Sequence, residues 1–150
     1  MALNIVLFEP EIPNNTGNIG RLSLASGTNL HLVKPFGFQL DDSRVKRAGL
    51  DYWKHISLTI YESIDDFYSK NIGKEMVYFS SHGKQDYWSV DYQDDLFLIF
   101  GKESKGLPKE IIEENIDKTF SQEVGLVGHE NPKVLISPME VTISINVAEF

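Results

Sequence analysis

The residues best placed to contact a ligand follow a continuous apolar run in the middle of the chain. Leu96–Phe100 ends abruptly in a polar loop that runs from Gly101 to Gly106 and contains Glu103. An apolar run bounded by turn signals favours a strand buried on both faces, and Pro108 suits the first position of a helix. Strand, tight loop and helix is the geometry that holds ligands at the carboxyl end of a parallel sheet, where glycines let backbone amides approach. An ordinary strand-to-helix turn remains the alternative for this segment alone.

The loop lacks the signatures of common nucleotide-binding turns. Four residues separate Gly101 from Gly106, as in a P-loop, but Leu107 and Pro108 stand where that motif needs lysine and then serine or threonine. No G-x-G-x-x-G pattern occurs, so a dinucleotide fingerprint is unsupported. A generic nucleotide hydrolase would also need a metal-binding or nucleophile motif, and the sequence offers none.

A second cluster of polar side chains follows the first apolar run, Leu3–Phe8. Pro10 and Pro13 stop that strand from continuing, and Asn14, Asn15 and Thr16 are good helix caps. A rough helical stripe of apolar residues then runs to Gly27, and Arg21 falls in the second turn, pointing back toward the loop. As a bare pattern this is also compatible with an N-cap cluster of purely structural origin.

Metal chemistry has little support. The chain has no cysteine, which excludes disulfides, thiolate zinc sites and a cysteine nucleophile. The four histidines, at positions 31, 55, 82 and 129, show no ligand spacing, so we expect solvated or capping roles for them and no metal site.

The alternation of patterns predicts one α/β domain over residues 1–150, with a parallel sheet flanked by helices. We expect strands at 3–8, 29–33, 56–61, 75–80 and 95–100, and helices at 15–26, 42–49, 63–70 and 108–116. Polar loops at 80–84, 101–106 and 136–146 would then surround one ligand. No apolar run approaches the ~20 residues of a membrane span, and the N-terminus lacks the basic region and cleavage site of a signal peptide.

The charge balance is unusual for a protein that binds nucleic acid. The formal net charge is −8, whereas phosphate binding usually needs a basic face. Locally, however, basic and aromatic side chains gather at Arg44, Lys46, Arg47, Tyr52, Trp53 and Lys54. Such a mixture can contact phosphates and stack on bases, although a solvated helix face is the plain alternative.

Together these segments resemble the SPOUT superfamily of RNA methyltransferases. The residues that carry the resemblance are P-E-I-P-N-N-T-G-N-I-G-R, from Pro10 to Arg21, and F-G-K-E-S-K-G-L-P, from Phe100 to Pro108. The stretches at 34–38, 41–53 and 90–95 also match, and the similarity runs from Leu3 to about Ile112. The nearest match is the small TrmL (YibK-like) branch, which methylates the ribose 2′-oxygen of the tRNA wobble nucleotide.

The resemblance implies S-adenosylmethionine as cofactor, tRNA as substrate, a homodimer, a cytoplasmic location and a trefoil knot. Arg21 would be catalytic, with Asn15 positioning it or the ribose. Implied cofactor-binding residues are Phe79, Gly101, Glu103, Gly106, Ile136, Ser144 and Asn146. Implied RNA-binding residues are Arg44, Lys46, Arg47 and Tyr52. We also expect a side chain added at Gly101 to occupy space that the cofactor needs.

The C-terminal segment departs from the family pattern. Residues 121–135 look like an insertion, and a degenerate third motif follows at Ile136-Ser-Pro-Met-Glu and Ser144-Ile-Asn-Val-Ala. The family's final helix is almost entirely missing before Phe150, so we expect an incomplete knot and a weakened homodimer. The alternative function is a non-catalytic RNA- or nucleotide-binding relic of the same fold.

Overall fold

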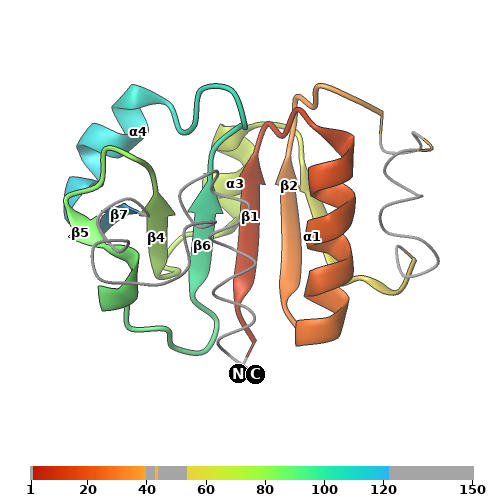
Figure 1. Cartoon of the computed structure of the whole chain (residues 1–150), viewed down its shortest axis with the longest axis horizontal. Coiled ribbons are helices and arrows are strands. Elements are labelled where there is room, and N and C mark those ends of the chain that lie inside the picture. The colour runs from red at the N-terminus through yellow and green to blue at the C-terminus, as the bar shows by residue number, and fades with distance from the viewer. Residues whose placement is uncertain (1, 40–42, 44–53, 122–150) are drawn as a thin grey trace, which may run out of the picture.

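The computed structural model describes residues 2–39, 43 and 54–121. Its core is a parallel sheet of seven strands in the order β3-β2-β1-β6-β4-β7-β5 (Figure 1). The strands are β1 (Asn4–Phe8), β2 (Asn29–Val33), β3 (Leu58–Tyr61), β4 (Met76–Phe79), β5 (Gln85–Asp86), β6 (Phe97–Phe100) and β7 (Thr119–Ser121). The helices are α1 (Pro13–Ser26), α3 (Ile64–Lys70) and α4 (Lys109–Glu114), with short 3₁₀ turns at Tyr87–Ser89 and Ile116–Lys118.

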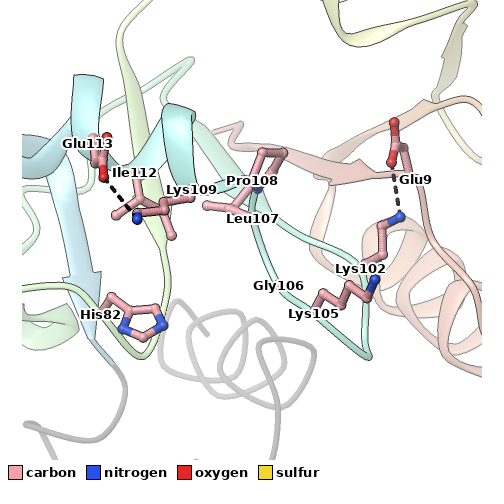
Figure 2. Close-up of a pocket in the computed structure, with 10 residues that line it drawn as sticks. All are labelled: Glu9, His82, Lys102, Lys105, Gly106, Leu107, Pro108, Lys109, Ile112 and Glu113. Carbon is pink, nitrogen blue, oxygen red and sulfur yellow. Dashed lines mark ion pairs between the residues drawn. The ribbon is translucent and has the colours of Figure 1, made fainter.

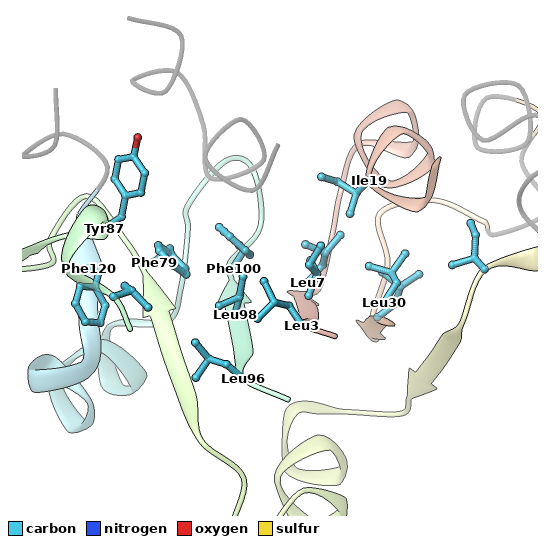
Figure 3. Packing of buried hydrophobic residues seen from close by; sticks show 14 residues of the cluster. Leu3, Leu7, Ile19, Leu30, Phe79, Tyr87, Leu96, Leu98, Phe100 and Phe120 are labelled. Atoms are coloured by element: carbon cyan, nitrogen blue, oxygen red, sulfur yellow. The ribbon is translucent and has the colours of Figure 1, made fainter. Parts of the chain in front are cut away.

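The central strands are apolar along their whole length because both faces of the sheet are covered. Every residue of β1 and β6 is buried. Alternate residues belong to two separate clusters, so Ile5 and Leu7 face one side while Val6 and Phe8 face the other. Ile19 of α1 packs over the first cluster, as Figure 3 shows. Phe67 of α3 and Ile112 of α4 cover the second, which gives three layers.

The strand order creates a switch point between β1 and β6. From β1 the chain crosses by α1 to β2 on one side, whereas α4 leaves β6 on the opposite face of the sheet. The loops that follow β1 and β6 therefore diverge at the carboxyl ends of two neighbouring strands. In open parallel sheets this is where ligands bind.

The predicted α/β class is confirmed, and all five predicted strands are present, each within two residues of its expected bounds. The predicted helices at 15–26, 63–70 and 108–116 are confirmed as α1, α3 and α4 with shifted ends. Strands β5 and β7 were not predicted, because two or three residues are too few to show an alternating or continuous apolar pattern. The helix predicted at 42–49 lies, apart from Ser43, outside the described residues, as does the knot region from 122 onward. None of the described helices is long and apolar enough to span a membrane.

His31 departs from expectation, because it is buried rather than solvated. Its Nε2 lies 2.9 Å from Asn4 Oδ1, and its Nδ1 lies 2.9 Å from the Tyr61 hydroxyl oxygen. The Asn4 amide donates its Nδ2 to Asp95, which leaves Oδ1 as an acceptor. Nε2 therefore donates to Asn4, which fixes the tautomer of the neutral ring, and its Nδ1 then accepts from the Tyr61 hydroxyl. Among the described residues no group of three or more potential ligands is arranged to hold a metal ion.

The buried His31 predicts a stability that falls on mild acidification. Burial lowers the pKa of His31 from its usual 6.5 to about 4, against the opposing pull of the Asp95 carboxylate. Between these values the unfolded chain binds the proton and the folded chain does not, so the free energy of unfolding decreases as pH falls through this window. The expected loss is on the order of 3 kcal/mol by pH 4. Urea titrations at several pH values measure it. His31→Gln should remove most of the slope, and an unchanged slope in that variant would contradict the assignment.

Candidate functional site

A cavity of about 650 Å³ lies at the carboxyl ends of β1, β4 and β6 (Figure 2). Its lining comes from the loops after these strands and from the start of α4. The lining residues are Glu9, His82, Lys102, Lys105, Gly106, Leu107, Pro108, Lys109, Ile112 and Glu113. The cavity therefore occupies the switch point, at the position where the sequence predicts a ligand.

The cavity has an apolar floor and a mixed but mainly basic rim. Leu107 and Ile112 are buried and supply the apolar part. On the rim, Lys102 Nζ lies 3.2 Å from Glu9 Oε1, and Lys109 Nζ lies 3.8 Å from Glu113 Oε1. Lys105 is exposed and has no ion pair within the described part of the chain. An apolar floor beside lysine side chains, one of them unpaired among the described residues, suits a ligand that combines a flat ring with an anionic group.

The glycine-bounded loop is closed by its own backbone. The N–H of Gly106 donates to the carbonyl of Lys102 over 2.8 Å, and Gly106 has a φ of 70°, a left-handed conformation that glycine adopts without strain. A Cβ added at Gly101 would lie 2.0 Å from the carbonyl carbon of Gly106 and 2.2 Å from the amide nitrogen of Leu107. The expectation that Gly101 leaves room for a ligand is thus corrected: the space beside its Cα is filled by the returning loop.

Two carboxylates join this loop to the segment before α1. Glu103 Oε2 accepts from the N–H groups of Glu11 and Ile12, over 2.8 and 3.0 Å. In return, Glu11 Oε1 accepts from the N–H of Ser104 over 2.9 Å and from its Oγ over 2.7 Å. These hydrogen bonds to Ser104 hold the pKa of Glu11 below its usual value. We call Glu11, Glu103 and Ser104 the carboxylate clamp.

The clamp explains how α1 begins without a cap of its own. Helix α1 starts at Pro13, and its N-cap residue Ile12 makes no side-chain cap. The prediction that Asn14, Asn15 and Thr16 cap the helix is wrong, because all of them lie inside its first turns. Glu103 instead supplies a negative charge at the positive end of the helix, on the N–H of the N-cap residue itself. The expectation for Pro108 is off by one position, since it is the N-cap of α4 and Lys109 is the first helical residue.

Arg21 lies on the exposed face of α1, in line with Asn14 and Asn18 at intervals of seven and three residues. It is nine residues beyond Ile12, which places it about 13 Å further along the helix axis. Asn15 is six residues before Arg21 and so points about 120° away around the helix. Direct pairing between them is not favoured by this geometry, and their catalytic roles stay predictions.

The remaining predicted residues divide into two groups. Phe79 is the last residue of β4, and its ring stacks on Phe100 in the core with centroids 4.8 Å apart. Only the backbone of Phe79 can then contact a ligand. Outside the described residues lie Ile136, Ser144, Asn146, Arg44, Lys46, Arg47 and Tyr52. The Glu11–Ser104 pair was not predicted from the sequence, where the available signal was an acidic residue in each of the two loops that follow adjacent strands.

Removing the charge of Glu103 should loosen the start of α1. Glu103→Gln weakens two charge-assisted hydrogen bonds, so we expect a loss of about 1–2 kcal/mol in the free energy of unfolding. Urea denaturation measures the loss. Glu110→Gln removes the same charge from an exposed site on α4 and is the matched control. Equal effects of the two substitutions would show that the clamp contributes nothing beyond net charge.

The two glycines of the loop should respond differently to alanine. Gly101→Ala forces a methyl group into the loop backbone and should cost about 1–3 kcal/mol or more of unfolding free energy. Gly106→Ala meets no atom within 4 Å and suffers only from its positive φ, so a cost of about 1 kcal/mol is expected. Chemical denaturation of both variants tests this order. A Gly101→Ala variant as stable as Gly106→Ala would refute the close approach.

Comparison with known proteins identifies the family. Residues 2–121 match the model of the SpoU rRNA Methylase family. A protein of Geobacillus stearothermophilus, named as a candidate tRNA (cytidine(34)-2'-O)-methyltransferase, is 48% identical over 121 residues, which cover 79% of this chain and 77% of that protein.

Solved structures agree with this match. One, described as giving structural insights into the 2-OH methylation of C/U34 on tRNA, has a TM-score of 0.83 at 33% identity and covers 99% of this chain and 93% of its own. The SpoU methyltransferase AviRb from Streptomyces viridochromogenes, solved with AdoMet, has a TM-score of 0.75 at 18% identity and covers 97% of this chain and 57% of its own, a likeness of fold alone. Because the family match spans most of the sequence, and the resemblance to SPOUT RNA methyltransferases runs through the same residues, the chain belongs to the SpoU methylase family.

Proposed function

We propose that this protein transfers a methyl group from S-adenosylmethionine to the ribose 2′-oxygen of the wobble nucleotide, cytidine or uridine 34, of a tRNA. The observation that carries the proposal is the high identity to relatives named for this activity, at 48% over 121 residues. The structural comparison supports the same reaction, because the neighbour concerned with C/U34 methylation covers 99% of this chain. A cytoplasmic location and a homodimer, both implied by the family, belong to the proposal.

The described residues fit an adenosine-containing cofactor in two respects. Glu103 follows the lining residue Lys102, and its buried Oε1 has no hydrogen-bond partner within the described part of the chain, so this oxygen has the capacity to accept a hydrogen bond from a ligand hydroxyl. The apolar floor and basic rim of the cavity suit a base and a carboxylate. The backbone at Phe79, Gly101, Gly106 and Ile136 would hold the cofactor, and Ser144 and Asn146 would order the third loop.

When bound, S-adenosylmethionine supplies an electrophilic methyl group, so the protein needs mainly to align the ribose and favour loss of its hydroxyl proton. We assign the second task to Arg21. An arginine side chain is a poor base because its pKa is so high, but its fixed positive charge stabilises negative charge that develops on the 2′-oxygen. Asn15 would orient the ribose. No step of this scheme calls for a metal ion.

An acidic protein can bind tRNA if its cations gather where the phosphates lie. The chain carries a net charge of −8, yet Lys102, Lys105 and Lys109 stand together at the cavity. The basic residues expected to bind RNA, Arg44, Lys46 and Arg47 with Tyr52, would extend this area. We therefore expect the affinity for tRNA to fall steeply with salt, as phosphate contacts require.

The direct test is transfer of labelled methyl groups from S-adenosylmethionine to tRNA. A tRNA with a 2′-deoxy nucleotide at position 34 is the matched control, since it lacks only the acceptor oxygen. Methylation that persists on the deoxy substrate would overturn the assignment of the target. Binding of RNA with neither methyl transfer nor binding of S-adenosylmethionine would favour the non-catalytic relic instead.

Arg21→Ala should abolish methyl transfer and leave the affinity for S-adenosylmethionine largely unchanged. The reason is that Arg21 lies on α1, away from the glycine-bounded loop, and acts on charge that appears only in the transition state. We expect kcat to fall by about 10²–10³-fold. Steady-state kinetics and calorimetry measure the two effects. Lys70→Ala, which removes an exposed positive charge from α3, is the control. Loss of cofactor binding in parallel with activity would contradict this division of labour.

A further inference from the structure

A pair of stacked aromatic rings follows strand β2. The rings of Phe36 and Phe38 are nearly parallel, with an interplanar angle of 14° and centroids 5.7 Å apart. Phe36 packs against the core cluster that contains Leu7 and Leu30, so the inner ring is anchored. Phe38 is the outer ring of the pair and is only half-buried. We call Phe36 and Phe38 the aromatic platform.

The platform is fixed to the segment that carries the carboxylate clamp. The N–H of Gly37, between the two rings, donates to the carbonyl of Pro10 over 3.0 Å. One residue earlier, the N–H of Glu9 donates to the carbonyl of Val33 over 2.9 Å. The next residue after Pro10 is Glu11, whose carboxylate holds Ser104. The platform therefore adjoins the proposed active site and is held rigidly to it.

A second cavity opens beside the rings, and a cation stands at its rim. It measures about 450 Å³ and is lined by Lys34, Pro35, Phe36, Phe38, Gln39 and Glu62. Lys34 Nζ lies 3.4 Å from Glu62 Oε2, but both side chains are well exposed, at 43% and 77%. An exposed ion pair of this kind contributes little, so Lys34 can exchange Glu62 for a stronger anion such as a phosphate.

We propose that Phe38 binds an unpaired nucleobase of the tRNA anticodon loop by stacking, with Lys34 on the neighbouring phosphate. This inference rests on the proposed function for the identity of the RNA. Single-stranded RNA is recognised by rings that extend its own base stack and by cations that follow its backbone. Phe38 offers a flat ring already stacked on an anchored neighbour, so little freedom is lost on binding. In sequence, the expected RNA-binding residues begin at Arg44, six positions later.

A nucleobase accounts for this surface better than a protein side chain does. The patch combines one outer aromatic ring with one lysine, in a cavity within the usual range of about 300–1,000 Å³ for ligand sites. A protein partner would need a far larger apolar area to bind stably. A base with its phosphate matches both the ring and the charge.

The test is binding of an anticodon stem-loop RNA to the full chain. Phe38→Ala and Phe38→Leu should both weaken binding about 5- to 100-fold, the range found when a base loses its aromatic partner. Phe38→Tyr should bind as the wild type does, because it keeps the ring. The leucine variant separates stacking from simple apolar burial. Ile72→Ala, which trims an apolar side chain that is 84% exposed at another turn, is the control and should change nothing.

Abasic substitutions in the RNA then identify the base. At one loop position, removal of the base should weaken binding to the wild type and have no further effect on Phe38→Ala. Independent, additive losses at every position, or equal affinities for the wild type and the leucine variant, would overturn the proposal. Affinity for S-adenosylmethionine should stay unchanged in all variants. Because the readout is RNA binding, a wild type that binds the stem-loop without methylating it would refute the proposed reaction and leave this test intact.

Discussion

The arrangement of the candidate site depends on the reciprocal hydrogen bonds between the loops after β1 and β6. Glu11 and Glu103 each accept from the opposite loop, across about ninety residues of sequence. The pairing exists because the sheet order makes β1 and β6 neighbours while their helices leave on opposite faces. Each buried or partly buried carboxylate needs hydrogen-bond donors. Backbone N–H groups of the opposite loop, which make no sheet hydrogen bonds, provide them. The clamp thus provides hydrogen-bond partners for the backbone of both loops and fixes the loop that carries the lining residues Lys102 and Lys105.

The same edge of the sheet gathers positive charge, which explains how an acidic protein can bind an anionic substrate. Three lysines line the cavity, and two of them are paired with Glu9 and Glu113. These ion pairs are partly or largely exposed, so each contributes little energy. The glutamates keep the lysines in place, and a phosphate can replace them at little cost. Net charge describes the long-range field of the whole molecule, whereas binding depends on which charges stand at the site. The chain can therefore repel nucleic acid weakly overall and still attract it at one edge.

The sequence predicted the parts of this structure that depend on local pattern. The runs at Leu3–Phe8 and Leu96–Phe100 are buried strands because apolar residues on both faces admit no other placement in a layered fold. It could not predict contacts made across the fold. Glu11 meets Ser104 only through the strand order, and Gly101 is needed for a backbone approach that no spacing reveals. His31 likewise looks like any polar residue until Asn4 and Tyr61 are found around it.

The four residues from Glu9 to Ile12 connect the loop after β6, the loop after β2 and the first turn of α1. Lys102 and Glu103 hold them from the side of β6, and the backbone of the β2 loop holds them from the other side. Since α1 has no side-chain cap of its own, its first turn takes its position from these outside contacts. Arg21 is rigidly joined to that turn by the helix. The orientation of the proposed catalytic arginine is therefore set jointly by the loop expected to bind the cofactor and by the loop expected to bind RNA.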